Sequence, residues 1–358
     1  MDRRPTNIKY RGHYKRFDTS SNNNDDDDTL IELYDNGPKI RCQLKNLRRK
    51  GSKFNSRYCQ SGYTSVTMVD ADCPTTSTNY YYDDWNYDSD NNIKRRRRKK
   101  CFAASIVMGG SLYHINSKGM VTETNSSDYP DEDDPIIDDD DEEEEDKQYT
   151  PLESSRMIRG NSTMDIINLN NLQDLNSLQT AIDSSKTIID ILVVATKGAK
   201  DDAEYYKYGP IEDLVNLAIA ETNQAFDNSG INVEINLAKL HIDDSGYTND
   251  LDDSLSSTLY HLTYTQGHSK DKDGLLDYIH QMRKDVGADM VQLITTGQGC
   301  GVAWASGNTI NADRMFSVSK YSCAVGYYTF AHELGHNIGA LHDKGTSNTC
   351  GSADYVSM

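Results

Sequence analysis

The spacing of apolar residues changes near Thr187, and from there onward it is typical of an α/β domain. Ile188–Ala195 is an apolar run interrupted only by Asp190, which predicts a buried strand. Apolar residues then recur at helical spacing from Pro210 to Phe226, and proline at the first position favours a helix start. Ile231–His241 alternates apolar with polar residues, as a half-buried strand does.

A second helix, three more strands and a final helix follow. The polar stretch between residues 242 and 274 predicts a long loop, after which apolar residues at helical spacing predict a helix from Leu275 to Val286. The remaining elements are strands at residues 290–294, 300–305 and 315–318 and a helix from about Tyr328 to Ile338. The alternation of helices and strands predicts one α/β domain over residues 187–358.

The residues before this domain have a different composition. Residues 1–37 are polar, with an Asn- and Asp-rich run at 22–28, and predict disorder. Residues 38–123 predict a small β-rich domain, with strand-like pieces at 39–44, 65–69, 102–108 and 111–115. Residues 124–186 are acidic and polar, and the run Asp131–Asp146 predicts a solvated linker because its charges repel one another.

Residues 332–342 carry the clearest chemistry in the chain. On a helix, His332 and His336 lie four residues apart, so their imidazoles project from one face and can share a zinc ion. Glu333 can reach a water on that metal without being a ligand. Gly339 can adopt the backbone conformation that ends a helix, so that the chain turns and returns His342 to the same ion. Three protein ligands leave a fourth position for water, as in catalytic zinc sites.

A helix with surface histidines is the alternative interpretation of this motif. Phe330, Leu334 and Ile338 make the helix apolar and indicate that it is buried. Because unpaired polar groups are costly in a buried helix, histidines there require a partner. The apolar context therefore favours the metal site.

The full motif, H-E-x-x-H-x-x-G-x-x-H, resembles the signature of the metzincin zinc peptidases. Asp343 directly after it resembles the adamalysin (reprolysin) branch. The resemblance implies a metzincin-type catalytic domain: a twisted mixed sheet, two long helices and an active-site helix, with one Zn²⁺ ion. It also implies that Asp343 is structural and that Met358 is the methionine of the turn beneath the zinc; a chance methionine is the alternative. We expect the domain to be incomplete at its C-terminus.

The strand at residues 301–305 is our candidate for the substrate-binding edge of the sheet. The resemblance implies that substrate lies extended along an edge strand, and glycine-rich loops flank this one. The residues involved would be Gly301, Val302, Ala303 and Trp304; an internal strand is the alternative. Cys300 and Cys323 flank the last two strands before the zinc helix, and we expect them to form a disulfide.

Composition limits the partners and the setting. The net charge of −19 argues against nucleic acid, and no apolar run is long enough to span a membrane. The N-terminus lacks the apolar core of a signal peptide. Nevertheless, the sequons at Asn125 and Asn161, together with the family resemblance, favour the secretory pathway or the extracellular space. The sequence does not indicate an oligomeric state.

These features predict a zinc-dependent endopeptidase that hydrolyses protein or peptide substrates and is made as a zymogen. Glu333 would be its general base. The segment at 38–123 would be the pro-domain. A cysteine switch by Cys101 is an alternative for inhibition, although its surroundings do not match the family's switch motif. The alternative function is a catalytically silent metzincin-fold module for binding or adhesion, and the presence of Glu333 argues against it.

Overall fold

The computed structural model describes residues 9–13, 15–18, 28–33, 38–43, 45–47, 56–61, 64–71, 101–125, 136, 186–206, 208–247, 254–271, 273–305 and 311–342. The chain divides into two compact units. Unit 1 comprises Met1–Asp131, Gly198–Glu221 and Tyr321–Tyr328. Unit 2 comprises Glu132–Lys197, Thr222–Lys320 and Thr329–Met358.

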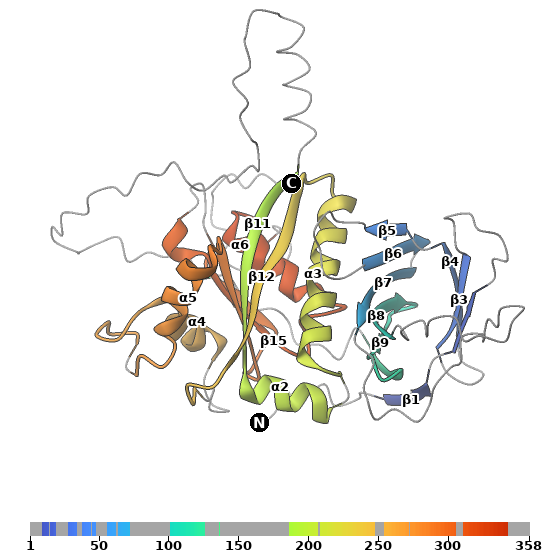
Figure 1. Ribbon diagram of the computed structural model, residues 1–358, viewed down its shortest axis with the longest axis horizontal. Coiled ribbons are helices and arrows are strands. Elements are labelled where there is room, and N and C mark those ends of the chain that lie inside the picture. Colours follow the sequence, from blue (N-terminus) through green and yellow to red (C-terminus); the bar gives the residue numbers. More distant parts are fainter. Residues whose placement is uncertain are drawn as a thin grey trace, which may run out of the picture. The chain divides into compact units, whose positions relative to one another are not determined.

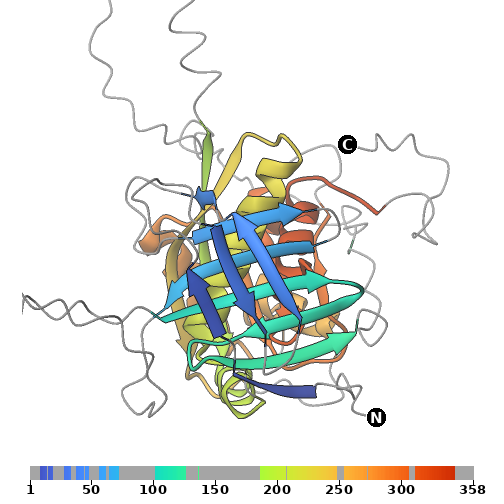
Figure 2. The ribbon, with the colours of Figure 1, turned by 90° about the vertical axis from the view of Figure 1, so that its right-hand side faces the viewer.

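Unit 1 is built on a seven-stranded antiparallel sheet in the order β1-β10-β9-β8-β7-β6-β5. Figure 2 shows these strands side by side, coloured from blue to teal. A second sheet of three strands has the order β2-β3-β4. The strands are β1 (Lys9–His13), β2 (Lys15–Asp18), β3 (Asp28–Glu32), β4 (Lys39–Gln43), β5 (Lys45–Leu47), β6 (Ser56–Ser61), β7 (Thr64–Ala71), β8 (Cys101–Met108), β9 (Ser111–Ile115) and β10 (Met120–Asn125).

The strand-like pieces predicted between residues 38 and 123 are confirmed as β4, β7, β8 and β9. The prediction of disorder for residues 1–37 is wrong for β1, β2 and β3. These strands are polar, so composition gives no sign of them, but pairing satisfies their backbone groups: β1 pairs with β10, and β3 pairs with β2 and β4. The core of the unit includes Val66, Met68, Phe102, Ile106 and Ile115, all at most 5% exposed.

Unit 1 also includes residues from two helices and a later loop. These are most of α2 (Lys197–Tyr205), which the sequence did not predict, the first part of α3 (Ile211–Asn228) and the segment 321–328. His114 of β9 donates its Nε2–H to the carbonyl of Tyr208 at 2.7 Å. Glu221 of α3 accepts the backbone N–H of Gly326 at 2.7 Å. A Cβ added at Gly326 would lie 2.3 Å from Leu112 Cδ1, so β9 packs tightly against this loop.

Unit 2 contains a five-stranded sheet in the order β12-β11-β13-β15-β14. Its first four strands in this order are parallel, and β14 runs antiparallel to β15 at one edge. The strands are β11 (Thr187–Thr196), β12 (Val233–Asp243), β13 (Met290–Thr295), β14 (Gly301–Ala303) and β15 (Phe316–Lys320), several of which are labelled in Figure 1. Each was predicted as a strand, and the predicted bounds differ from the observed ones by one or two residues.

The helices of this part of the chain depart from the prediction at one place. The expected loop before residue 275 contains α4 (Leu255–Thr263), and α5 (Tyr278–Val286) is shorter than predicted. The region therefore holds two short helices where the resemblance implied a second long one. Gly267 and Gly274, with φ of 106° and 65°, lie between them, and glycine readily adopts such turns. The coarse prediction of a mixed α/β domain is confirmed.

One apolar cluster connects the sheet of unit 2 with α4 and α5. It contains Leu192, Leu259, Ile279, Trp304 and Phe316 among others, each at most 1% exposed. The zinc-motif helix, α6 (Thr329–Asn337), contacts both β14 and β15. Within the described segments, no helix combines the length and apolar character needed to cross a membrane.

Candidate metal centre

Helix α6 is fixed to the sheet by an asparagine at its end. The side-chain amide of Asn337, which is fully buried, donates to the carbonyls of Trp304 and Phe316, each at 3.0 Å. Because these carbonyls follow β14 and begin β15, the helix is held against the edge of the sheet. The sequence did not single out Asn337, which follows directly after His336 in the motif.

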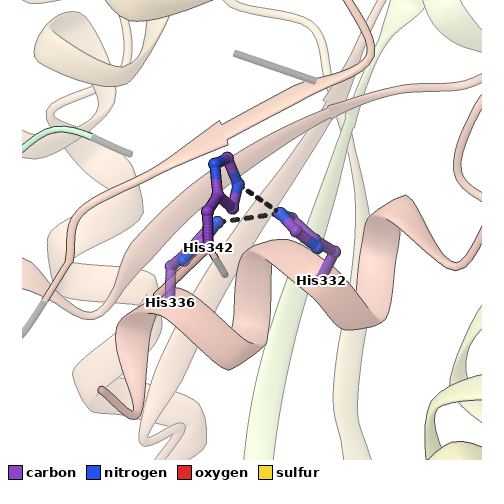
Figure 3. Close-up of side chains that lie close together, drawn as sticks. All are labelled: His332, His336 and His342. Carbon is purple, nitrogen blue, oxygen red and sulfur yellow. Dashed lines mark hydrogen bonds between the residues drawn. The ribbon is translucent and has the colours of Figure 1, made fainter. Parts of the chain in front are cut away.

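The three histidines of the motif converge on one point. His332 Nε2 lies 2.9 Å from His336 Nε2 and 2.9 Å from His342 Nε2. Figure 3 shows His332 and His336 projecting from the helix toward His342, which follows it. The ring centroids are 4.4 to 5.0 Å apart. The structure therefore brings together the three residues proposed as ligands.

The chain turns after α6 in a way that accounts for His342. Gly339 has φ of 103°, a conformation that residues with a Cβ rarely adopt. The N–H of Ala340 donates to the carbonyl of Gly335 at 2.9 Å, which closes the helix. The carbonyl of Ala340 in turn accepts a hydrogen bond from His336 Nδ1–H at 2.8 Å. That bond fixes the tautomer of His336 and directs the Nε2 lone pair toward the other rings.

The electrostatics of the site also suit a metal ligand set. Burial, together with the smaller effect of the neighbouring His342, lowers the pKa of His332 to about 4. His332 is therefore neutral near pH 7, which is the form that binds metal. Zinc bonds to imidazole of about 2.0–2.1 Å imply nitrogen–nitrogen separations of about 3.3 Å in a tetrahedral site. The observed 2.9 Å separations are close to this value, so the residues present fit a zinc ion.

Glu333 is buried against the edge strand. Its side chain has no exposed surface, and it lies next to Gly301 of β14. A Cβ added at Gly301 would be 2.3 Å from Glu333 Oε1 and 2.7 Å from Thr329 Cγ2. Such contacts are far shorter than real Cβ atoms make, so glycine is required for this packing. The sequence indicated Gly301 only as part of a strand and not as a neighbour of the glutamate.

The candidate substrate strand is at the edge of the sheet and carries a contact from far upstream. Ile136 forms an isolated parallel bridge with Trp304. Its N–H donates to the carbonyl of Ala303 at 2.9 Å, and its carbonyl accepts the N–H of Ala305 at 2.9 Å. The Ile136 side chain packs on the apolar cluster that contains Trp304. Sequence analysis missed Ile136, although Pro135-Ile136-Ile137 is the apolar interruption in the acidic run.

Comparison with known proteins identifies the part of the chain that holds this centre. Residues 185–357 match the family model described as metallo-peptidase family M12. A protein named peptidyl-Asp metalloendopeptidase from Stenotrophomonas maltophilia (strain R551-3) is 35% identical over 171 residues. Residues 185–357 form a metzincin-like metallopeptidase domain.

Two further relatives of the metallopeptidase domain are also named peptidyl-Asp metalloendopeptidase. The one from Xanthomonas campestris pv. campestris is 34% identical over 167 residues, and the one from Pseudomonas aeruginosa is 25% identical over 182 residues. The matches take in 48%, 46% and 46% of this chain but only 37%, 36% and 27% of the three relatives. The chain therefore spans about a third of the length of these relatives.

Structural similarity adds no further argument for the metallopeptidase domain. The solved structure titled "Structure of a chaperone-substrate complex" aligns with a TM-score of 0.34 and 18% identity, over 46% of this chain and 26% of the other. A similarity of that size supports no conclusion about fold or function.

The other residues that the sequence singled out have different outcomes. Cys300 and Cys323 are each disulfide-bonded, and so are Cys59 and Cys101. A disulfide-bonded Cys101 cannot supply the free thiolate that a cysteine switch needs. Asp343 and Met358 lie outside the described residues, as does the acidic run apart from Ile136.

Proposed function

We propose that this chain is a zinc-dependent endopeptidase, with His332, His336 and His342 as metal ligands and Glu333 as general base. The observation that carries the proposal is the convergence of three imidazole nitrogens beside a fully buried glutamate. Nitrogen ligands from three histidines suit zinc better than the hard, oxygen-preferring cations.

The residues of the site divide the work of peptide hydrolysis. When bound, zinc would lower the pKa of a coordinated water to about 7 and polarise the substrate carbonyl. Glu333 would accept a proton from the attacking water on its carboxylate and deliver it to the leaving nitrogen. Burial of Glu333 excludes bulk water from this transfer, and its packing against Gly301 fixes where the carboxylate lies. The hydrogen bond from His336 to Ala340 would hold that ring in its ligand orientation.

The proposed substrate is an extended protein or peptide segment paired with β14. An edge strand offers unpaired N–H and C=O groups that an extended chain can use. The pairing of Ile136 with residues 303–305 supports this use, because one extended residue already makes both main-chain hydrogen bonds there.

The same contact supports synthesis as a zymogen. Ile136 lies before the metallopeptidase domain in the sequence and occupies the edge where we expect substrate. In this proposal, residues 38–123 are the pro-domain and the segment around Ile136 blocks the strand until it is released. The disulfide-bonded cysteines support a secretory or extracellular setting, where disulfides persist.

The name of the relatives suggests the chemistry of the substrate. We extend "peptidyl-Asp" to this chain and propose that an aspartate flanks the bond that it cleaves. The residues on either side of Ile136 include Asp133, Asp134 and Asp138. The sequence around Ile136 therefore has the composition of the proposed substrate, and we propose that cleavage within the acidic run activates the enzyme.

The test compares the full chain with its Glu333→Gln variant. Both should bind zinc at the triad, and only the wild type should cleave a peptide library, with cleavage concentrated beside aspartate. General acid–base catalysis contributes about 10²- to 10⁴-fold, and the variant should lose activity in that range. Zinc binding without any cleavage would favour the silent binding module instead. Activity that survives in the variant would contradict the role of Glu333.

A second pair of variants tests the zymogen. Ile136→Asp should weaken the contact with the edge strand and raise the basal cleavage rate of the uncleaved chain. Ile188→Asp is the matched control, because Ile188 is 46% exposed on β11. Equal basal rates in both variants would show that Ile136 does not restrain the site.

A further inference from the structure

A second group of metal-ligand side chains lies away from the histidine triad. His261, Asp271 and Asp273 each offer a ligand atom, and these atoms lie within 4.8 Å of one another. His261 belongs to the last turn of α4, and the two aspartates lie in the connection to α5, both helices being orange in Figure 1. The ligands therefore come from two separate elements of unit 2.

The distances within this group suit a small divalent cation. His261 Nδ1 lies 3.0 Å from Asp271 Oδ1 and 3.6 Å from Asp273 Oδ1. Metal bonds of about 2.0–2.2 Å to nitrogen and oxygen imply ligand–ligand separations of about 3.3–3.5 Å in a tetrahedral site. The two observed separations bracket that range. They resemble the 2.9 Å nitrogen–nitrogen separations of the histidine triad.

Asp271 gives an independent reason to expect a cation. It is only 2% exposed. Its Oδ1 accepts the N–H of Gly274 at 3.2 Å and lies against His261, whereas its Oδ2 is buried without a hydrogen-bond partner among the described residues. A buried carboxylate oxygen that lacks a partner costs on the order of 1–3 kcal/mol or more. A cation bound by the carboxylate would remove that cost.

We propose that His261, Asp271 and Asp273 bind a second divalent cation of the zinc class. One imidazole and two carboxylates are a ligand set that zinc accepts, whereas calcium takes six to eight oxygen ligands. The Asp273 side chain is 42% exposed and that of His261 is 16% exposed, so water can complete the coordination from the solvent side. The site is separate from the triad and does not depend on the proposed peptidase activity.

The position of the site suggests a structural role. A cation would fasten the end of α4 to the connection that follows it. Thr263, two residues after His261, accepts the indole N–H of Trp304 at 2.7 Å, and Trp304 directly follows β14. Ordering this end of α4 would therefore stabilise the edge strand β14 through the bond between Thr263 and Trp304. The cation itself would not contact the reacting atoms.

The experiment counts zinc per chain after dialysis of the full protein at neutral pH. Wild type should hold about two zinc ions, and Asp273→Asn should hold about one. Asparagine keeps the oxygen that accepts the N–H of Leu275, so the turn is retained while the charge is lost. Asp285→Asn on α5 is the matched control, because it removes one charge outside the site and should still bind two ions. Circular dichroism of each variant confirms that it is folded.

A His336→Gln background separates the two sites. It should lose the ion of the triad and keep the second one, which Asp273→Asn should then remove. If His336→Gln alone abolishes all zinc binding, His261, Asp271 and Asp273 form an ion pair without a metal, and the proposal is overturned. Calcium binding in that background, in place of zinc, would overturn the assigned class of cation.

Discussion

In unit 1, Glu221 and His114 are buried against backbone groups, whereas in unit 2 the buried Glu333 and the half-buried His332 belong to the metal motif. Glu221 accepts the N–H of Gly326, and His114 donates to the carbonyl of Tyr208. Each of these groups has a backbone partner. His332 instead faces two imidazole nitrogens at 2.9 Å.

The pKa values of the two histidines do not separate these roles. Burial lowers the pKa of His114 to about 4, and burial together with the neighbouring His342 lowers that of His332 to about 4 as well. A perturbed pKa therefore marks a buried histidine but not a functional one. The nature of the partner distinguishes them: a carbonyl oxygen completes a hydrogen bond, whereas converging nitrogen lone pairs repel one another unless a proton or a cation lies between them.

The largest effect should come from exchanging the two histidines for glutamine. His332→Gln should abolish the triad's zinc and lower kcat/KM by on the order of 10³-fold or more, because the metal's contribution of several kcal/mol is lost. His114→Gln should keep both zinc and activity and change only the stability of unit 1. Metal analysis and cleavage assays on the full chain measure both effects. Zinc loss in His114→Gln would contradict the contrast between the two histidines.

A smaller effect should come from Gly301, which packs against Glu333, and can be compared with Gly335, which does not. Gly301→Ala would place a methyl group 2.3 Å from Glu333 Oε1, so the carboxylate must shift. A misplacement of about 1 Å can cost about 10²-fold, and we expect kcat to fall by that order while zinc stays bound. Gly335 lies on α6, the helix that carries Glu333. The atom nearest to a methyl group added there would be Ala340 Cβ at 3.7 Å, which is an ordinary van der Waals contact.

Gly335→Ala is therefore the matched control for Gly301→Ala. Alanine in a helix is favoured over glycine by up to about 1 kcal/mol, so this variant should be slightly more stable and equally active. Steady-state kinetics with zinc analysis distinguishes the two substitutions. Equal kcat values would mean that the packing of Gly301 against Glu333 does not position the base.

What the sequence revealed about the site depended on local spacing. His332, Glu333 and His336 lie within five residues of one another, and Gly339 permits the turn to His342. Helical geometry alone relates these positions. Gly301 next to Glu333, Ile136 next to Trp304 and His261 next to Asp271 are contacts between segments distant along the chain or across a loop. No sequence periodicity encodes these contacts, so they can be recognised only in the folded structure.

The fold was likewise predictable only where the local spacing of apolar residues encodes a helix or a strand. Buried strands such as β11 and β13 are apolar runs with a single polar interruption each, at Asp190 and Gln292, and α3 has eighteen residues of helical spacing. By contrast, α4 has only nine residues, with serine and threonine among them, and its helical pattern is short. The polar strands β1 to β3 are held by pairing with neighbours, which composition does not reveal.

The smallest effect should come from Glu221 of unit 1, which is expected to change how stability depends on pH but not activity. Burial raises the pKa of Glu221 to about 7, which the hydrogen bonds from Gly326 and Ser105 only partly oppose. Because the folded pKa lies above the unfolded value of 4.5, the stabilisation is complete below pH 4.5 and is lost as the pH rises toward 7. His114 has the opposite sign: its folded pKa of about 4 lies below 6.5, so stability is lost as the pH falls from 6.5 toward 4.

Glu221→Gln should therefore remove one side of this pH dependence and leave catalysis unchanged. Between pH 5.5 and 7 the ionisation of Glu221 costs about 2 kcal/mol, at 1.36 kcal/mol per pH unit. Relative to wild type, the variant's free energy of unfolding should thus gain about 2 kcal/mol between pH 5.5 and 8. Urea denaturation of the full chain at the two pH values measures that difference of differences, in which any constant effect of the substitution cancels. A gain near zero would mean that Glu221 is already ionised at pH 5.5 when folded, and that the N–H of Gly326 outweighs its burial.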